Sequence, residues 1–139
     1  CNKIQGQVTS ATCAIAQKAT EVAMLAEPSE IAFMKDEFHK RRDLMLSKLN
    51  EIPGVKTNIP QGAFYIFPDV SSYFGKSNGS ITIKDSSDFC MYLLNDAYVA
   101  LVAGAAFGSP DCVRISYAAS EENLVEAANR IKNSLAKLN

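Results

Sequence analysis

Hydrophobic residues recur at the three- and four-residue spacing of an α-helix in several stretches of the chain. The first stretch covers residues 15–26 and ends at Pro28, and the second covers residues 29–52 and ends at Pro53 and Gly54. A further helix is expected over residues 85–97, with Asp85 or Ser86 as its N-cap. The last helix is expected to start after Ser120 and to run to about residue 138.

The segments between these helices have the aromatic and β-branched composition of strands. Strands are expected in residues 62–70, 98–104 and 112–118, with one helical turn at 71–74. The connection between the last two strands is expected to be tight, with Gly104 and Gly108 in unusual backbone angles. The pattern therefore predicts an α+β fold with a small sheet that helices cover on one face.

Composition excludes several function classes. The net charge of -1 argues against a nucleic-acid or membrane-surface partner, and no apolar run reaches the ~20 residues that cross a bilayer. One histidine and scattered cysteines argue against a Cys/His metal site, and the residues at the start lack the apolar core of a signal peptide. A cytoplasmic protein is expected. Because residue 1 is a cysteine, we also expect the chain to be part of a longer protein.

Arg114 differs from the other three arginines, Arg41, Arg42 and Arg130, which lie in charged helical segments. It lies within an expected strand, where a period of two places it on one face with Cys112 and Ser116. The planar guanidinium suits bidentate binding of a carboxylate. The residues leave three possibilities open, namely a ligand, an internal pair with Asp or Glu, and an exposed sheet face.

Other polar residues have simpler interpretations. His39 and the basic residues 40–42 are expected on a solvated helix face, because acidic residues are interleaved with them. Ser10 or Thr12 is expected to cap the first helix.

Four motifs in the same order resemble the C-terminal part of class I aminotransferases, in the bacterial aspartate aminotransferase-like branch. They are KIQGQVTSATCAIAQKA, PQGAFYIFPDVSSYFG, VALVAGAAFG and CVRISYAASEENL. The resemblance implies the small α+β domain of fold-type I aminotransferases, with a small, mostly antiparallel sheet. It assigns residues 1–27 to a remnant of the large domain and 28–139 to the small domain, with a bridging helix at about 29–52.

The resemblance also implies functional residues. Arg114 would bind the α-carboxylate of the substrate, and Thr9 and Ser10 would reach the active site across a homodimer boundary. The intact protein would use pyridoxal 5'-phosphate to move an amino group between an amino acid, such as aspartate, and a 2-oxo acid. No residue of this chain matches the family's Schiff-base lysine or its ring-binding residues. We therefore expect no catalytic, cofactor-binding or metal-binding residue in the chain, no bound cofactor, and no activity of these 139 residues alone.

Two alternatives remain beside this interpretation. A pyridoxal-phosphate-dependent β-lyase would use the same arginine, and a stand-alone acid-binding or dimerisation module would need no cofactor. The sequence also departs from the family pattern at Ala103, where a proline usually precedes the glycine.

Overall fold

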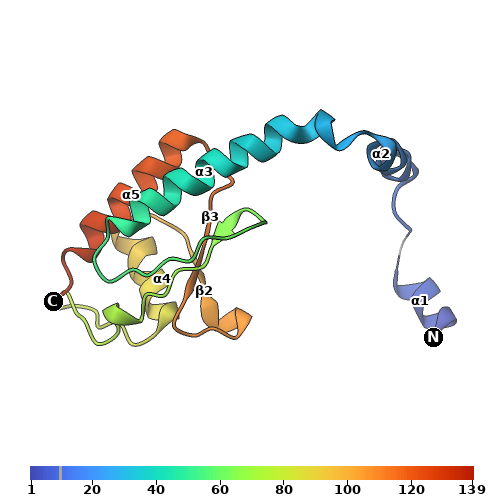
Figure 1. The fold of residues 1–139 in the computed structure, drawn as a ribbon. Coiled ribbons are helices and arrows are strands. Elements are labelled where there is room, and N and C mark those ends of the chain that lie inside the picture. The colour runs from blue at the N-terminus through green and yellow to red at the C-terminus, as the bar shows by residue number, and fades with distance from the viewer. Residues whose placement is uncertain (10) are drawn as a thin grey trace. The chain divides into compact units, whose positions relative to one another are not determined.

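The computed structural model describes residues 1–9 and 11–139, and they form two compact units (Figure 1). One unit consists of Cys1–Met34 and the other of Lys35–Asn139. Each unit is described by itself. None of the helices in the described residues is both long and apolar enough to cross a membrane.

The first unit contains helices α1 (Asn2–Val8) and α2 (Ala14–Leu25), the 3-10 helix η1 (Pro28–Ile31) and the first turn of α3. The expected helix over 15–26 is thus confirmed, whereas α1 had no prediction. Cys13 occupies the N-cap of α2 without a side-chain hydrogen bond, so the prediction of Thr12 as the cap is wrong. Ser10, the other predicted cap, lies outside the described residues.

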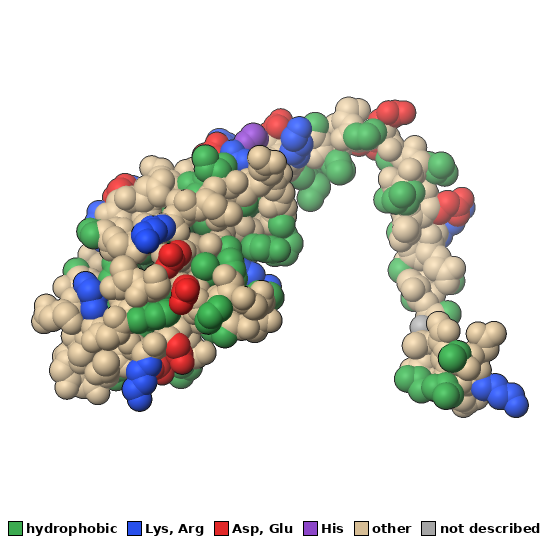
Figure 2. All heavy atoms as spheres, turned by 60° about the horizontal axis from the view of Figure 1, so that its bottom comes forward, with side chains coloured by type: hydrophobic (Ala, Val, Ile, Leu, Met, Phe, Trp, Pro, Cys, Tyr) green, Lys and Arg blue, Asp and Glu red, His purple; other side chains and the backbone are tan. Residues whose placement is uncertain are grey.

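No described residue of the first unit is buried within this chain. Its hydrophobic side chains are visible on the surface in Figure 2. Ile15, Met24 and Leu25 are about four-fifths exposed, and Val22 is 61% exposed. An apolar helix of this kind normally packs against other protein atoms.

The second unit is built from three α-helices, two 3-10 helices and a three-stranded sheet. Its elements are α3 (Ala32–Asn50), β1 (Tyr65–Ile66), η2 (Ser71–Tyr73), α4 (Ser86–Asp96), β2 (Val102–Ala103), η3 (Gly104–Phe107), β3 (Val113–Ser116) and α5 (Glu121–Leu135). The long helix begins at Ala32 rather than at 29, because η1 takes up the residues after Pro28. Asp85 and Ser120 cap α4 and α5 as predicted, each accepting a hydrogen bond from the first turn.

The sheet is antiparallel in the order β1-β3-β2, so β3 is its central strand. This confirms the predicted α+β fold with a small antiparallel sheet. The strands are shorter than predicted for a physical reason. Pro68 has no N–H to donate to the ladder, and beyond β1 the chain makes only isolated bridges at Asp69.

The strand predicted over 98–104 is reduced to Val102–Ala103 because its first residues close helix α4. Tyr98 adopts the left-handed conformation with φ 55°, and the Val99 N–H donates to the Leu93 carbonyl at 3.2 Å. A left-handed residue with a hydrogen bond back into the last turn is a common helix ending. These residues are therefore unavailable for pairing with β3.

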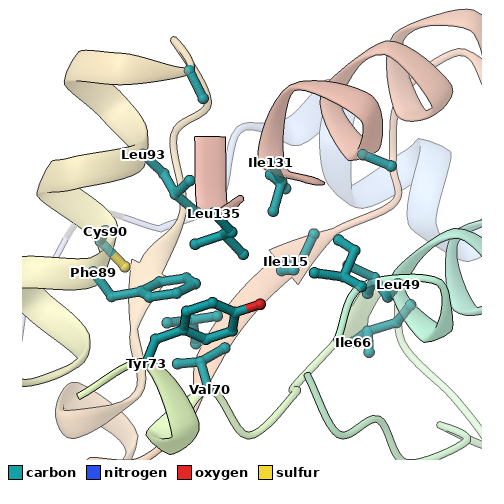
Figure 3. Close-up of a cluster of buried hydrophobic side chains, with 14 of the residues drawn as sticks. Leu49, Ile66, Val70, Tyr73, Phe89, Cys90, Leu93, Ile115, Ile131 and Leu135 are labelled. Carbon is teal, nitrogen blue, oxygen red and sulfur yellow. The ribbon is translucent and has the colours of Figure 1, made fainter. Parts of the chain in front are cut away.

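The hydrophobic core lies between one face of the sheet and helices α3, α4 and α5 (Figure 3). Ile66 from β1 and Val113 and Ile115 from β3 supply the sheet side. The helical side includes Leu49, Phe89, Leu93, Ile131 and Leu135. The apolar stripe predicted for the last helix is buried here, and so is that of the long helix from Met45 onward. At the other end of the long-helix stripe, Ile31 and Met34 are 62% and 48% exposed, so that part of the prediction is wrong within this chain.

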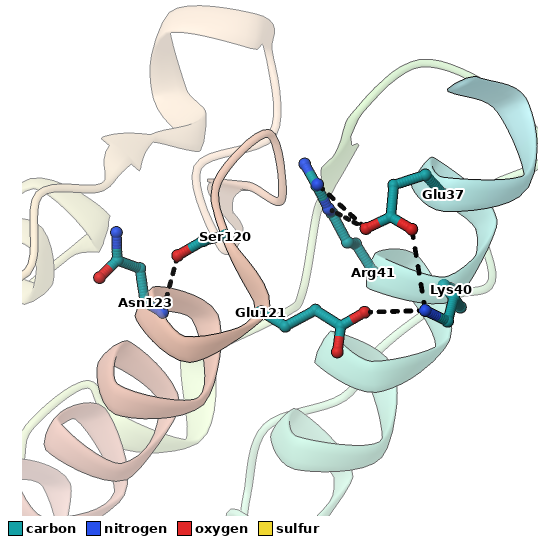
Figure 4. A network of polar contacts seen from close by, with 6 residues as sticks. All are labelled: Glu37, Lys40, Arg41, Ser120, Glu121 and Asn123. Carbon is teal, nitrogen blue, oxygen red and sulfur yellow. Dashed lines mark hydrogen bonds and ion pairs between the residues drawn. The ribbon is translucent and has the colours of Figure 1, made fainter. Parts of the chain in front are cut away.

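An ion pair joins α3 to α5, which run alongside each other in Figure 1. Figure 4 shows Glu37 between Arg41 and Lys40, and Lys40 in turn approaches Glu121 at 3.3 Å. His39 is exposed on the same helix. The prediction of a solvated helix face is confirmed for His39 and Lys40, whereas Arg41 and Arg42 are partly buried, with side chains that are 25% and 18% exposed.

Candidate functional site

The face of the sheet opposite the core carries the candidate site. β3 alternates between buried Val113 and Ile115 on the core side and Arg114 and Ser116 on the open side. Val102 on β2 is the partner of Arg114, and Tyr65 on β1 is the partner of Ser116. The open face is defined here by Tyr65, Phe67, Val102, Arg114 and Ser116, which are all exposed or half-buried.

Arg114 has no hydrogen-bond acceptor or carboxylate partner within residues 1–9 and 11–139. The other three arginines each pair with an acid: Arg41 with Glu37 at 3.0 Å, Arg42 with Asp43 at 2.7 Å, and Arg130 with Glu126 at 2.8 Å. The internal Asp or Glu pair that the sequence left open for Arg114 is therefore not formed in the described chain. Its donors remain available on the open face.

Two aromatic rings lie against the Arg114 guanidinium. Its central carbon is 4.8 Å from the ring centroid of Phe107 and 5.6 Å from that of Tyr65. Cations within about 6 Å of a ring face are attracted by the ring quadrupole. Phe107 also meets Phe67 edge to face at 6.0 Å, so the ring nearest the charge is itself packed against another ring.

The connection from β2 to β3 holds Phe107 in place. The Gly104 N–H donates to the Cys112 carbonyl at 2.8 Å, and the Cys112 N–H donates to the Ser109 carbonyl at 3.1 Å. Gly108 has φ +76°, which confirms its predicted unusual angle. Gly104 does not have a positive φ, so that part of the prediction is wrong. A glycine is needed there because a Cβ would lie 2.3 Å from the carbonyl oxygens of both Ser109 and Cys112.

The open face presents donors whose chemistry suits a carboxylate, and its residues as defined above include no group to hold an aldehyde cofactor covalently. A guanidinium presents paired N–H donors that match the two oxygens of a carboxylate. The described residues of the face contain no lysine, and the set of arginine, aromatic and hydroxyl side chains is not a pyridoxal phosphate site. In the described chain, no group of three or more His, Cys, Asp or Glu side chains is placed to hold a metal ion.

The other predicted site residues lie in the first unit. The Thr9 hydroxyl is exposed and donates to the Gln5 carbonyl at 2.6 Å, which is a local helix-end interaction. Ser10 lies outside the described residues, so its predicted role has no structural test.

A pocket of about 380 Å³ lies between α3 and residues 60–64, on the side of β3 that carries Tyr117 rather than Arg114. Lys35, His39 and Arg42 line it beside aromatic side chains. Arg42 is already engaged, since it donates to the Pro60 carbonyl at 3.2 Å and pairs with Asp43. Burial raises the pKa of the Tyr117 phenol, which donates to the Ala63 carbonyl at 2.9 Å. Arg42 and Tyr117 therefore already bond within the chain, and the pocket is separate from the open face.

Sequence reasoning identified Arg114 but not the two rings against it. Phe107 and Tyr65 are 7 and 49 positions away in sequence, and their contact depends on the β1–β3 register and on the turn at residues 104–112. The only sequence signal was the aromatic content of the segments that contain them.

Comparison with known proteins gives a consistent result. The family model for aminotransferase class I and II matches residues 1–131. A bifunctional aspartate aminotransferase and glutamate/aspartate-prephenate aminotransferase of Petunia hybrida is 46% identical over 99% of this chain. An aspartate/prephenate aminotransferase of Cereibacter sphaeroides is 44% identical over 97% of it.

Solved structures agree with the sequence matches. The crystal structure of the aspartate aminotransferase from Rhizobium meliloti superposes with a TM-score of 0.89 over 98% of this chain, at 41% identity. The aspartate aminotransferase of Thermotoga maritima superposes with a TM-score of 0.76 over 96% of the chain, at 36% identity.

The chain spans only about a third of these proteins: 30% of the Petunia protein, 34% of the Cereibacter protein and 34% of the Rhizobium structure. The match nevertheless runs along nearly the whole chain, and the fold is that of the fold-type I aminotransferases. The chain therefore belongs to the class I and II aminotransferase family.

Proposed function

We propose that the protein containing this chain is a pyridoxal-phosphate-dependent aminotransferase, and that Arg114 binds the α-carboxylate of its amino-acid and 2-oxo-acid substrates. The observation that carries the proposal is the guanidinium of Arg114. It lies on the open face of the central strand with no acid partner in the described chain, whereas every other arginine is paired. Relatives named as aspartate aminotransferases support aspartate, a dicarboxylic amino acid, as the amino donor.

The remaining parts of the proposal concern the rest of the protein. We assign residues 1–27 to the large domain, and the exposed apolar side chains of α2 support this because they need a packing partner. The cofactor would be held by residues outside this chain and would supply the chemistry at the substrate amino group. A homodimer with Thr9 and Ser10 near the neighbouring site, and a cytoplasmic location, stay predictions.

Arg114 contributes binding and orientation in this proposal. A bidentate carboxylate contact fixes one end of the substrate, so that the bonds at its α-carbon have one direction relative to the reacting groups. Holding reactants in a productive geometry lowers the barrier without any chemistry by the arginine itself. Lysine would keep the charge but lose the planar fork of donors.

The test uses the full-length protein with its cofactor bound. Arg114→Ala and Arg114→Lys are compared with Arg130→Lys, an exposed arginine on α5 that pairs with Glu126. Removing one partner of a desolvated charge pair costs about 2–5 kcal/mol, or roughly 30- to several-thousand-fold in affinity. We expect aspartate to be needed at correspondingly higher concentration in both Arg114 variants, with the cofactor absorbance unchanged, and the Arg130 variant to match the wild type.

Product analysis separates the proposal from the β-lyase alternative. Transamination of aspartate with 2-oxoglutarate forms one glutamate for each aspartate consumed and releases no ammonia. A β-lyase needs a leaving group on the β-carbon, which aspartate lacks, so it would form no glutamate from aspartate but would convert β-chloroalanine to pyruvate, ammonia and chloride. Equal aspartate affinity in the wild type and both Arg114 variants would show that Arg114 does not bind the substrate.

A further inference from the structure

We propose that Phe107 and Tyr65 are positioning residues for Arg114, holding its guanidinium over their rings before a substrate carboxylate binds. The inference rests on the proposed function of Arg114 and adds two residues that act through it. It starts from the two short distances, 4.8 Å to Phe107 and 5.6 Å to Tyr65, at an arginine that has no acid partner in residues 1–9 and 11–139.

An arginine without such a partner needs another interaction to fix the conformation of its side chain. Its side chain has many rotamers, and fixing them at the moment of binding lowers the affinity for a ligand. A ring face attracts the guanidinium without any carboxylate of the protein, so a substrate carboxylate has no internal Asp or Glu to displace when it binds. The two rings can therefore restrict the guanidinium in advance and leave its carboxylate-binding donors available.

Both rings are themselves held by the fold. Phe107 ends η3, inside the turn closed by the Gly104 and Cys112 backbone hydrogen bonds, and it meets Phe67 edge to face. Tyr65 is fixed by its pairing with Ser116, two residues from Arg114 on β3. The contacts thus join rigid parts of the structure rather than three independent surface side chains.

Both rings are exposed on the same face as the guanidinium. Phe107 is 51% exposed and Tyr65 is 38% exposed, whereas the core side of the same sheet buries the aliphatic Ile66, Val113 and Ile115. Large aromatic residues normally bury most of their surface. Here they lie beside the one charged side chain of the open face as defined above.

The competing explanation is that these rings only pack against another part of the protein. Substitutions that keep or remove the ring distinguish the two. Phe107→Tyr and Tyr65→Phe keep the ring, whereas Phe107→Leu and Tyr65→Leu keep apolar bulk and remove it. Each is made in the full-length holoenzyme with Arg114 and again with Arg114→Ala.

Two quantities are measured. The first is the dissociation constant of maleate, a dicarboxylate that carries no amino group to transfer, from the absorbance of the bound cofactor. The second is the KM and kcat for L-aspartate. We expect each leucine variant to weaken maleate binding and raise KM by about 5- to 30-fold, equivalent to about 1–2 kcal/mol, with kcat changed less. The ring-keeping variants should stay within about twofold of the wild type, a difference well below the tenfold that 1.4 kcal/mol represents.

The Arg114→Ala background decides the cause. If the rings act through Arg114, the leucine substitutions should have little further effect once the guanidinium is gone, because the coupling between contacting residues is lost. Effects of the same size in both backgrounds, or none in the wild-type background, would overturn the positioning role and leave the carboxylate role of Arg114 intact. If Arg114→Ala alone leaves maleate affinity unchanged, the proposed function fails, and the positioning role fails with it. Unchanged cofactor absorbance and circular dichroism confirm that the variants are folded.

Discussion

Gly104→Ala should loosen the turn that carries Phe107, and the structure sets the size of the effect. A Cβ at this position would lie 2.3 Å from the carbonyl oxygens of Ser109 and Cys112, whereas real Cβ atoms essentially never approach closer than 3.0 Å. Both oxygens accept hydrogen bonds inside the turn, from Cys112 at 3.1 Å and from Gly104 at 2.8 Å. Relief of the clash must therefore move the backbone that closes the turn.

Overpacking of this kind typically costs about 1–3 kcal/mol. Loss of one or two net hydrogen bonds, at about 0.5–1.5 kcal/mol each, gives a similar figure. If the cost appears as local opening, amide exchange in the turn should be faster by about 5- to 150-fold, because each 1.4 kcal/mol is a factor of ten. Hydrogen exchange of the full-length protein, followed by mass spectrometry of peptides covering residues 104–112, measures this directly.

Gly62→Ala is the matched control. A Cβ on Gly62 meets no atom within 4 Å, and its backbone is not left-handed. This variant should leave exchange in residues 104–112 unchanged. The reasoning is refuted if the Gly104 variant shows wild-type exchange in the turn, or if the control accelerates it equally.

Three further predictions concern stability and reactivity. Leu93→Ala should lower the free energy of unfolding by about 2–5 kcal/mol because Leu93 is fully buried, and Leu94→Ala should lower it far less because Leu94 is 43% exposed. Denaturant unfolding measures both values, and equal losses would contradict the core assignment. Burial raises the pKa of the Cys90 thiol to about 11, so at pH 8 iodoacetamide should modify the exposed Cys1 and Cys13 much faster than Cys90. Equal modification rates, measured by mass spectrometry, would disprove the protection of Cys90. The hydrogen bond from Lys137 lowers the pKa of Asp96 below 3.8, so the stability that this carboxylate contributes is present above pH 3.8 and is lost as the pH falls through the lowered pKa. Asp96→Asn should therefore make the free energy of unfolding less sensitive to pH in that range, and an unchanged acid transition would argue against the pair.

Local sequence features predicted the helical elements well. Asp85 and Ser120 are cap residues whose side chains accept hydrogen bonds from the next turn, and this interaction depends on only a few neighbouring residues. The spacing of Leu124, Ala128, Ile131 and Leu135 likewise places one face of a helix against the core. Such patterns determine a helix because its hydrogen bonds and its buried stripe are both local in sequence.

Strand lengths were less predictable, because pairing depends on residues that are distant in sequence. Residues 98–104 have strand composition, yet Tyr98 and Val99 complete the end of α4 and only Val102–Ala103 pair with β3. The requirement for Gly104 was also misassigned. Its restriction comes from the close approach of Ser109 and Cys112, which backbone propensities do not reveal.

The sequence by itself determined the α+β class, the N-caps of α4 and α5 and the special position of Arg114, because composition, capping and periodicity act over short distances. Tertiary structure alone decided that β3 is the central strand, that Arg114 has no acid partner among the described residues, and that Phe107 and Tyr65 lie against it. These features arise where strands and turns separated by up to 49 residues meet, and their register is set by the packing of the whole sheet on its core.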